Sequence, residues 1–268
     1  MRIALFRRSG RIAWALATMV MLGAAACASD PPLPVAGSVG EEKFLYDRGM
    51  EALKSKRWLA AREYFRRLVD THPRSPYRNS AKLGIGDSYL GEGRIDSLIL
   101  AANEFREFLT LAPLSEQADY AQYRLALSQV RQMLGPQRDQ TATRDALREL
   151  ERFREAYPTS NYKPEVDVLY RQARDRLSDH EFEIGRFQYR NGIYLGALNR
   201  FRALYDADPG YTRRDALIFY LAETLTRITL TKEARPLYEE LIKQYPKSEF
   251  VEEAKRRIGG APAAPVTR

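Results

Sequence analysis

The chain has 268 residues, 29% of them charged and 11% aromatic, a composition that excludes an intrinsically disordered protein. Its formal net charge is +8, but Arg2, Arg7, Arg8 and Arg11 supply four of these charges in a stretch without acidic residues. The small excess over the rest of the chain accompanies no nucleic-acid-binding motif. Solvated helix faces explain it, so no nucleic acid is expected as a partner.

The first 26 residues have the features of a signal peptide. Residues 2–11 are basic, and residues 12–26 form an apolar run that is too short to span a bilayer comfortably. Three alanines then precede Cys27, the only cysteine of the chain. Small residues before a lone cysteine resemble the lipidation motif of bacterial lipoproteins, and we predict lipid attachment at Cys27. Ordinary signal-peptidase cleavage, which would leave a free thiol, is the alternative.

Residues 27–40 are rich in proline and glycine and have no apolar period, which predicts a flexible tether. Ala28 stands where aspartate would favour retention in the inner membrane of enteric bacteria. We therefore expect the anchored protein on the periplasmic face of the outer membrane. The last ten residues, 259–268, have the composition of a disordered tail.

Residues 41–258 contain one pattern five times: an alanine, a large apolar residue four positions later, another three positions after that, and then a proline. The five sets are Ala61, Phe65, Leu68 and Pro73; Ala101, Phe105, Phe108 and Pro113; Ala146, Leu150, Phe153 and Pro158; Ala197, Phe201, Leu204 and Pro209; and Ala234, Tyr238, Leu241 and Pro246. Such residues share one helical face, and the proline ends the helix in the following turn. This is the second half of the tetratricopeptide pattern.

The pattern predicts an all-α solenoid of about five tetratricopeptide-like helix pairs. Gly49, Gly185 and Ala222 are expected where partner helices approach. Junctions such as PRSPY place a serine two residues after the proline, and we expect that serine to be the N-cap of the next helix. Residues 163–190 contain no internal break and predict one long central helix. The helices are expected near 43–55, 58–71, 76–91, 95–111, 116–133, 142–156, 163–190, 194–206, 213–228, 231–244 and 249–258.

The middle of the chain is the most distinctive part. The run QRDQTATRDALRELERFREAYPTSNY and the following RLSDHEFEIGRFQYRNGIYLGALNRFRAL resemble the BamD family of the bacterial β-barrel assembly machinery. The resemblance covers roughly residues 27–255. It implies a lipoprotein whose partners are the barrel insertase BamA, other lipoproteins of the machinery and unfolded outer-membrane proteins.

Candidate binding residues form two groups. Aromatic and basic residues on the first helices of the N-terminal repeats are expected to line a concave groove for substrate peptides, with ordinary inter-repeat packing as the alternative. They are Tyr46, Tyr89, Tyr120, Tyr123 and Arg124. The second group lies at the end of the long helix and in the next helix, where the resemblance implies insertase docking; Asn199 and Arg200 match the family's Asn-Arg pair. It consists of Arg186, Tyr189, Arg190, Tyr194, Asn199 and Arg200.

No catalytic constellation is visible in the sequence. The histidines, His72 and His180, lie in different repeats, and no phosphate-binding loop, metal-ligand spacing or nucleophile motif occurs. We therefore expect neither an enzyme nor a metal or cofactor site. Two other functions stay open at this point: a periplasmic scaffold for cell-envelope or cell-wall machinery, and a soluble peptide-binding chaperone.

Overall fold

The computed structural model describes residue 38 and residues 40–260. The expected signal peptide, the lipidation site Cys27, most of the tether and residues 261–268 of the tail lie outside the described residues. All regular secondary structure in the described part is helical, which confirms the all-α prediction. The helices are α2 (Glu41–Lys54), α3 (Trp58–Thr71), α4 (Arg78–Glu92), α5 (Ile95–Leu111), α6 (Ala118–Val130), α7 (Thr141–Ala156), α8 (Lys163–Arg190), α9 (Tyr194–Ala207), α10 (Arg214–Arg227), α11 (Thr231–Gln244) and α12 (Val251–Ile258).

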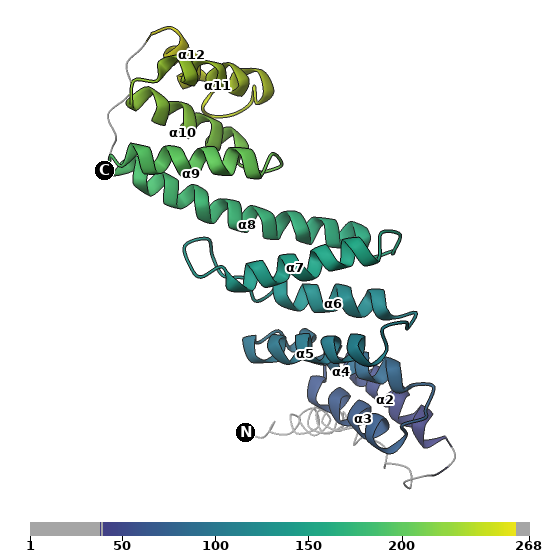
Figure 1. Cartoon of the computed structure of the whole chain (residues 1–268). Helices are drawn as coiled ribbons and strands as arrows, with labels where there is room; N and C mark the ends of the chain where they lie inside the picture. The colour runs from purple at the N-terminus through teal and green to yellow at the C-terminus, as the bar shows by residue number, and fades with distance from the viewer. Residues whose placement is uncertain (1–37, 39, 261–268) are drawn as a thin grey trace, which may run out of the picture. The chain divides into compact units, whose positions relative to one another are not determined.

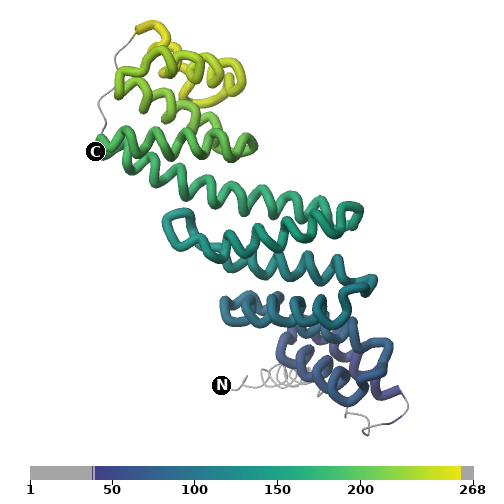
Figure 2. Tube along the Cα trace, viewed as in Figure 1, coloured from purple at the N-terminus to yellow at the C-terminus, as the bar shows by residue number. Residues whose placement is uncertain are grey.

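The helices form five antiparallel pairs that stack in chain order, followed by the short α12 (Figures 1 and 2). The pairs are α2 with α3, α4 with α5, α6 with α7, α8 with α9 and α10 with α11. We call the first member of each pair its A helix and the second its B helix. The array of helix pairs expected from the repeat is therefore confirmed, and each predicted helix lies within three residues of its observed bounds.

The repeated residues form the core. Every alanine and large apolar residue of the five sets is buried. Phe65 shows how the pattern works, because its ring lies against glycines of two different A helices. A Cβ atom built on Gly49 would lie 2.4 Å from this ring, and one built on Gly84 would lie 2.5 Å from it. In the first, second and fourth repeats, the large residue of the B helix thus occupies the space that glycines leave on neighbouring A helices.

The serines of the junctions do not occupy the predicted N-cap position. The Ser75 hydroxyl accepts a hydrogen bond from the backbone N–H of Tyr77 at 3.2 Å, and the Ser75 carbonyl accepts one from the N–H of Arg78 at 3.1 Å. These bonds close a tight turn before the helix, so α4 begins three residues after the serine. Pro76 lies within this turn. Ser115, Ser160 and Ser248 form the same turn.

The long helix α8 belongs to two hydrophobic clusters. Val166 and Ala173 in its first half pack with residues of α6 and α7. Phe182 and Tyr189 in its second half pack with residues of α9 and α10. The predicted 28-residue helix is confirmed, and it links the third repeat to the fourth by sharing its two halves between their cores. No helix in the described part of the chain is long and apolar enough to cross a membrane.

Candidate binding surfaces

The N-terminal candidates Tyr120 and Arg124 meet at a carboxylate that the sequence did not single out. The Tyr120 hydroxyl donates to Asp87 Oδ2 at 2.7 Å, and Arg124 Nε donates to Asp87 Oδ1 at 2.7 Å. Burial and the Asp87 charge raise the pKa of Tyr120 well above its usual range, so the hydroxyl stays protonated and remains a donor. The bonds join the A helices of the second and third repeats. Part of the Arg124 side chain, 22%, stays exposed.

Two other N-terminal candidates take part in a stacking contact that recurs between repeats. Tyr46 stacks on Tyr77, with ring centroids 4.9 Å apart, and Tyr123 stacks on Tyr162 at 5.1 Å. In the last repeat Phe219 stacks on Phe250 at 4.6 Å. The second member always lies four residues after the junction proline. The run QRDQTATRDALRELERFREAYPTSNY therefore contains a signal for this stacking pair, which is its final tyrosine, Tyr162.

The remaining N-terminal candidate, Tyr89, is a packing residue. Its ring is buried, and the Arg62 guanidinium lies over it at 4.4 Å from the ring centroid. Its hydroxyl accepts a hydrogen bond from Arg66 Nη2 at 2.6 Å. The structure thus brings Tyr120, Tyr123 and Arg124 together around Asp87 and Tyr162, and we call this group the Asp87 cluster. Tyr89 instead packs within the array.

The C-terminal candidates do not share one surface. Tyr189 is buried, its ring 5.7 Å from that of Tyr194, and burial raises its pKa to about 12. Arg186 lies on α8 beside the rings of Phe182 and Tyr220, with its guanidinium 5.8 and 5.5 Å from their centroids. Both therefore belong to the packing between A helices.

Arg200 lies on the B helix α9 and forms an ion pair with Glu181 of α8, with 38% of its side chain exposed. Asn199 beside it and Arg190 at the end of α8 are exposed. The sequence does not reveal this partner of Arg200. Its charge is matched within the chain, and a partner would have to share or replace Glu181.

Exposed apolar side chains lie near Arg190 in the chain, where α8 turns into α9. Phe187, Ile193 and Leu195 are 57%, 52% and 68% exposed. Phe187 and Arg190 also line a cavity of about 360 Å³ that reaches Pro136 in the long loop between α6 and α7. We call this region, with Asn199 and Arg200, the α8–α9 corner. The sequence alone does not identify these apolar residues as exposed, because residues of the same types are buried elsewhere in the chain and only the structure shows which helix faces meet solvent.

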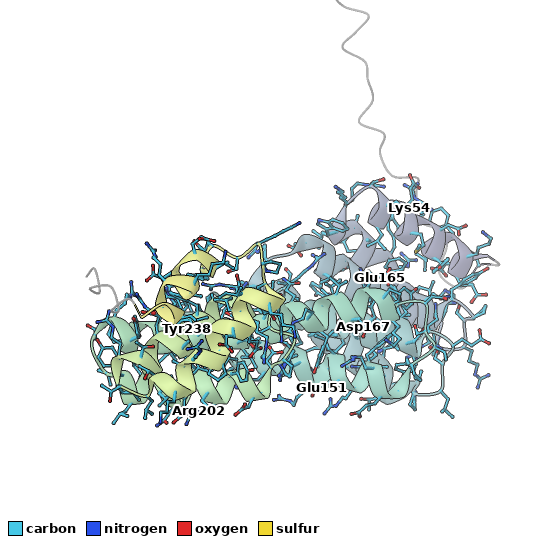
Figure 3. The ribbon with its side chains drawn as sticks, turned by 90° about the horizontal axis from the view of Figure 1, so that it is seen from above. Lys54, Glu151, Glu165, Asp167, Arg202 and Tyr238 are labelled. Carbon is cyan, nitrogen blue, oxygen red and sulfur yellow. The ribbon has the colours of Figure 1, made fainter. Side chains whose placement is uncertain are left out.

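A second group of side chains around a carboxylate, which we call the Glu223 cluster, lies at the C-terminal end of the array. Glu223 of α10 is almost fully buried, and it accepts hydrogen bonds from Tyr238 at 2.7 Å and from Arg257 Nε at 2.6 Å. The Tyr189 hydroxyl lies 3.4 Å from its other oxygen. Arg257 is 5% exposed and also pairs with Glu253. Figure 3 labels Tyr238, which lies on α11 toward the yellow, C-terminal end of the array.

The described residues contain no group of three or more histidine, cysteine, aspartate or glutamate side chains arranged to hold a metal ion. His180 uses Nδ1 in a hydrogen bond with the carbonyl oxygen of Pro136 at 2.6 Å, so it fixes the long loop to α8. The surfaces above therefore offer hydrogen bonds, aromatic faces and apolar contact, which is the chemistry of binding.

Comparison with known proteins connects this array to one family. The family model YfiO, described as outer membrane lipoprotein, matches residues 39–239. A Caulobacter vibrioides protein named outer membrane protein assembly factor BamD is 29% identical over 223 residues, 82% of this chain and 71% of that protein. A Rickettsia prowazekii protein of the same name is 24% identical, covering 80% of this chain and 84% of its own length.

A solved structure of MamA aligns with 80% of this chain and 96% of its own, at 17% identity and a TM-score of 0.34. The fold assignment accordingly rests on the helices described above. The family assignment rests on the match to the family model, which spans most of these helices. The chain belongs to the BamD family of outer membrane lipoproteins.

Proposed function

We propose that this protein is a lipid-anchored, non-catalytic component of the machinery that assembles β-barrel proteins in the outer membrane. The observation that carries the proposal is the family match over residues 39–239, which includes both the Asp87 cluster and the α8–α9 corner. The names of the relatives assign them to outer-membrane protein assembly. The protein would act from the periplasmic face, with Cys27 as its site of lipid attachment.

The N-terminal repeats supply the proposed substrate site. Tyr120, Tyr123 and Arg124 present a partly exposed guanidinium beside aromatic rings, and Asp87 holds both Tyr120 and Arg124 in place. An extended C-terminal segment of an unfolded barrel could place its carboxylate near Arg124 and its aromatic side chains on the tyrosines. Tyr46 and Tyr89 would support this surface through packing.

The α8–α9 corner supplies the proposed insertase site. Exposed apolar residues with a polar and charged border are the usual composition of a protein–protein interface. Phe187, Ile193 and Leu195 provide the apolar centre, and Arg190, Asn199 and Arg200 provide the border. Tyr189, Tyr194 and Arg186 lie behind it and fix the end of α8.

A charge reversal at Arg200 tests the division between the two sites. Arg200→Glu creates repulsion with Glu181 and with any acidic group on the insertase, so insertase binding should weaken by about a hundredfold or more. Binding of an unfolded barrel's C-terminal peptide should be unchanged. Both are measured on the same preparation by titration and by recovery of the insertase from detergent extracts.

The swapped variant Glu181→Arg with Arg200→Glu provides the control, because it restores the internal ion pair but not the contact with the partner. It should melt like the natural protein and still fail to bind the insertase. Equal loss of both ligands would indicate general unfolding, and full binding by the swapped variant would exclude Arg200 from the interface. Recovery of only cell-wall enzymes would favour the scaffold function instead.

Lipid attachment is tested separately. Cys27→Ser should release the mature protein from the membrane or leave it unprocessed. Processing of the natural protein that is insensitive to globomycin, the inhibitor of lipoprotein signal peptidase, would contradict lipidation.

A further inference from the structure

Exposed aliphatic and aromatic side chains collect along one edge of the array. Most of them in the described part of the chain lie in, or within two helical turns of, a connection from an A helix to its B helix. They are Leu59, Ile95, Ile99, Leu100, Leu134, Phe187, Ile193, Leu195 and Leu230, whereas Leu111, Leu114 and Val168 lie elsewhere. We call this side of the array the A–B edge.

The A–B edge is also basic. Residues 54–59, 131–138 and 227–232 each contain at least two lysines or arginines and no acidic residue. The connections from B helices to A helices, residues 72–77, 112–117, 157–162, 208–213 and 245–250, carry no net charge when they are taken together. Positive charge and exposed apolar side chains therefore coincide on one side of the array.

The first two connections from an A helix to its B helix form a single patch on this edge. Gly91 at the end of α4 lets the Trp58 ring pack against that helix, since a Cβ at Gly91 would lie 2.6 Å from the ring. Arg62 of α3 forms an ion pair with Glu92 of α4 at 2.9 Å. These contacts hold residues 54–59 next to residues 93–100, which we together call the N-terminal edge patch.

The patch presents cations and apolar side chains to solvent. Leu59, Ile95 and Ile99 are 64%, 59% and 47% exposed. Lys54, which Figure 3 shows at the margin of the ribbon, and Lys56 are exposed and form no ion pair within the described part of the chain. The one acid that lies in the patch, Asp96, pairs with Arg94 in a contact that is mostly open to solvent and therefore weak.

We propose that the N-terminal edge patch binds the surface of an anionic phospholipid bilayer. Lysine and arginine beside exposed aliphatic side chains suit this surface, because the cations meet lipid phosphates while the apolar groups enter the interfacial layer. Such binding goes beyond the proposed function: it would orient the array against the membrane, in addition to any lipid anchor and independently of the insertase and substrate sites.

The test uses the chain from residue 27 with Cys27→Ser, so that neither acyl chains nor the basic, apolar residues 2–26 contribute. Every described helix is retained. This protein should sediment with vesicles of phosphatidylglycerol and phosphatidylcholine at 0.1 M salt, and much less with vesicles of phosphatidylcholine alone. Lys54→Gln with Lys56→Gln should weaken binding to the anionic vesicles by about tenfold or more. Leu59→Ser with Ile99→Ser should also weaken it.

The control removes the same charge from the opposite edge. Arg74→Gln with Lys247→Gln changes two exposed cations there and should leave vesicle binding within about twofold. Equal weakening by both pairs would show that only net charge matters, and absence of vesicle binding would also overturn the proposal. If the patch variants bind vesicles normally but lose the insertase, the patch is a protein interface. Unchanged melting temperatures establish that each variant is folded.

Discussion

The Asp87 and Glu223 clusters use the same chemistry at two ends of the array, with different consequences. Each carboxylate accepts hydrogen bonds from a tyrosine and an arginine. Asp87 receives both from α6, and its side chain is 14% exposed. Glu223 receives them from α8, α11 and α12, and both it and Arg257 are 5% exposed. A partner can reach the first cluster, whereas the second is an internal connection between helices.

The largest expected effect comes from breaking the Glu223 cluster. Arg257→Ala leaves Glu223 buried without its main counter-charge, and loss of one partner from a buried ion pair costs about 3–5 kcal/mol. We expect a decrease in melting temperature of about 10 °C in thermal denaturation. Arg256→Ala, one residue earlier and 68% exposed, is the matched control and should change little. Similar melting of the two variants would contradict the internal role of Arg257.

Asp208 provides a third carboxylate with which to sharpen the comparison. Asp208 is buried and accepts two hydrogen bonds from Arg171 and one from Ser178. Burial alone would raise the pKa of Asp208, but these hydrogen bonds outweigh it and lower the pKa below the usual value. Its contribution to stability is therefore present above the ordinary aspartate pKa and disappears as pH falls through the lowered value.

Asp208→Asn should cost about 1–2 kcal/mol at pH 7, a value discounted because Arg171 is partly exposed. The difference from the natural protein should narrow as the pH decreases below about 3.8. Urea denaturation over this range measures it. A difference that stays constant down to the acid end would show that the charge of Asp208 is not responsible.

A smaller effect on stability is expected at the open cluster. Arg124→Ala removes a cation that keeps contact with solvent, and Asp87 can recruit water in its place, so the loss should be about 1 kcal/mol. Binding of the barrel peptide should nevertheless fall by at least tenfold. Titration calorimetry and thermal melting on one preparation separate the two quantities. A loss of stability as large as that of Arg257→Ala would remove the distinction between the clusters.

The smallest effect concerns backbone strain beside the Glu223 cluster. Thr229 connects α10 to α11 at a φ of 66°, where two other repeats have Gly93 and Gly192. A β-branched residue is strained in this region, so Thr229→Gly should stabilise the protein by up to about 1 kcal/mol. Gly192→Thr is the reciprocal change and should destabilise by a similar amount. Destabilisation by Thr229→Gly would mean that the hydrogen bond from the Thr229 hydroxyl to the Ile228 carbonyl, at 2.7 Å, outweighs the strain.

Much of the fold was predictable because helix periodicity and the position of each proline are local properties of the sequence. The alanine and large apolar residues of each set fixed the buried faces, and the unbroken run 163–190 fixed the long helix. The serine at each junction does lie just before the next helix, but it is not the N-cap, because a turn closed by the serine carbonyl comes before the helix begins.

The candidate sites were less predictable, because they depend on which residue of one repeat faces the next. Asp87, Glu181 and Glu223 look like ordinary helix-surface acids in the sequence, and only the stacking of A helices shows their partners. Tyr46 and Tyr123 could have been recognised as stacking residues from the aromatic residue four positions after the junction proline. For Arg200 the sequence contains no sign of its pairing with Glu181, nineteen residues away.

The placement of Phe65 between Gly49 and Gly84 has a consequence for how the array unfolds. The ring belongs to the first repeat but fills space that the second repeat also needs, so neither helix pair can open without exposing part of its neighbour's core. Gly185 and Phe201 make the corresponding contact within the fourth repeat, on the helix that spans two clusters. In a one-dimensional array such shared residues determine the coupling between neighbours. Denaturation should therefore proceed as a cooperative transition over several helix pairs, and isolated single repeats from this chain should not retain their structure.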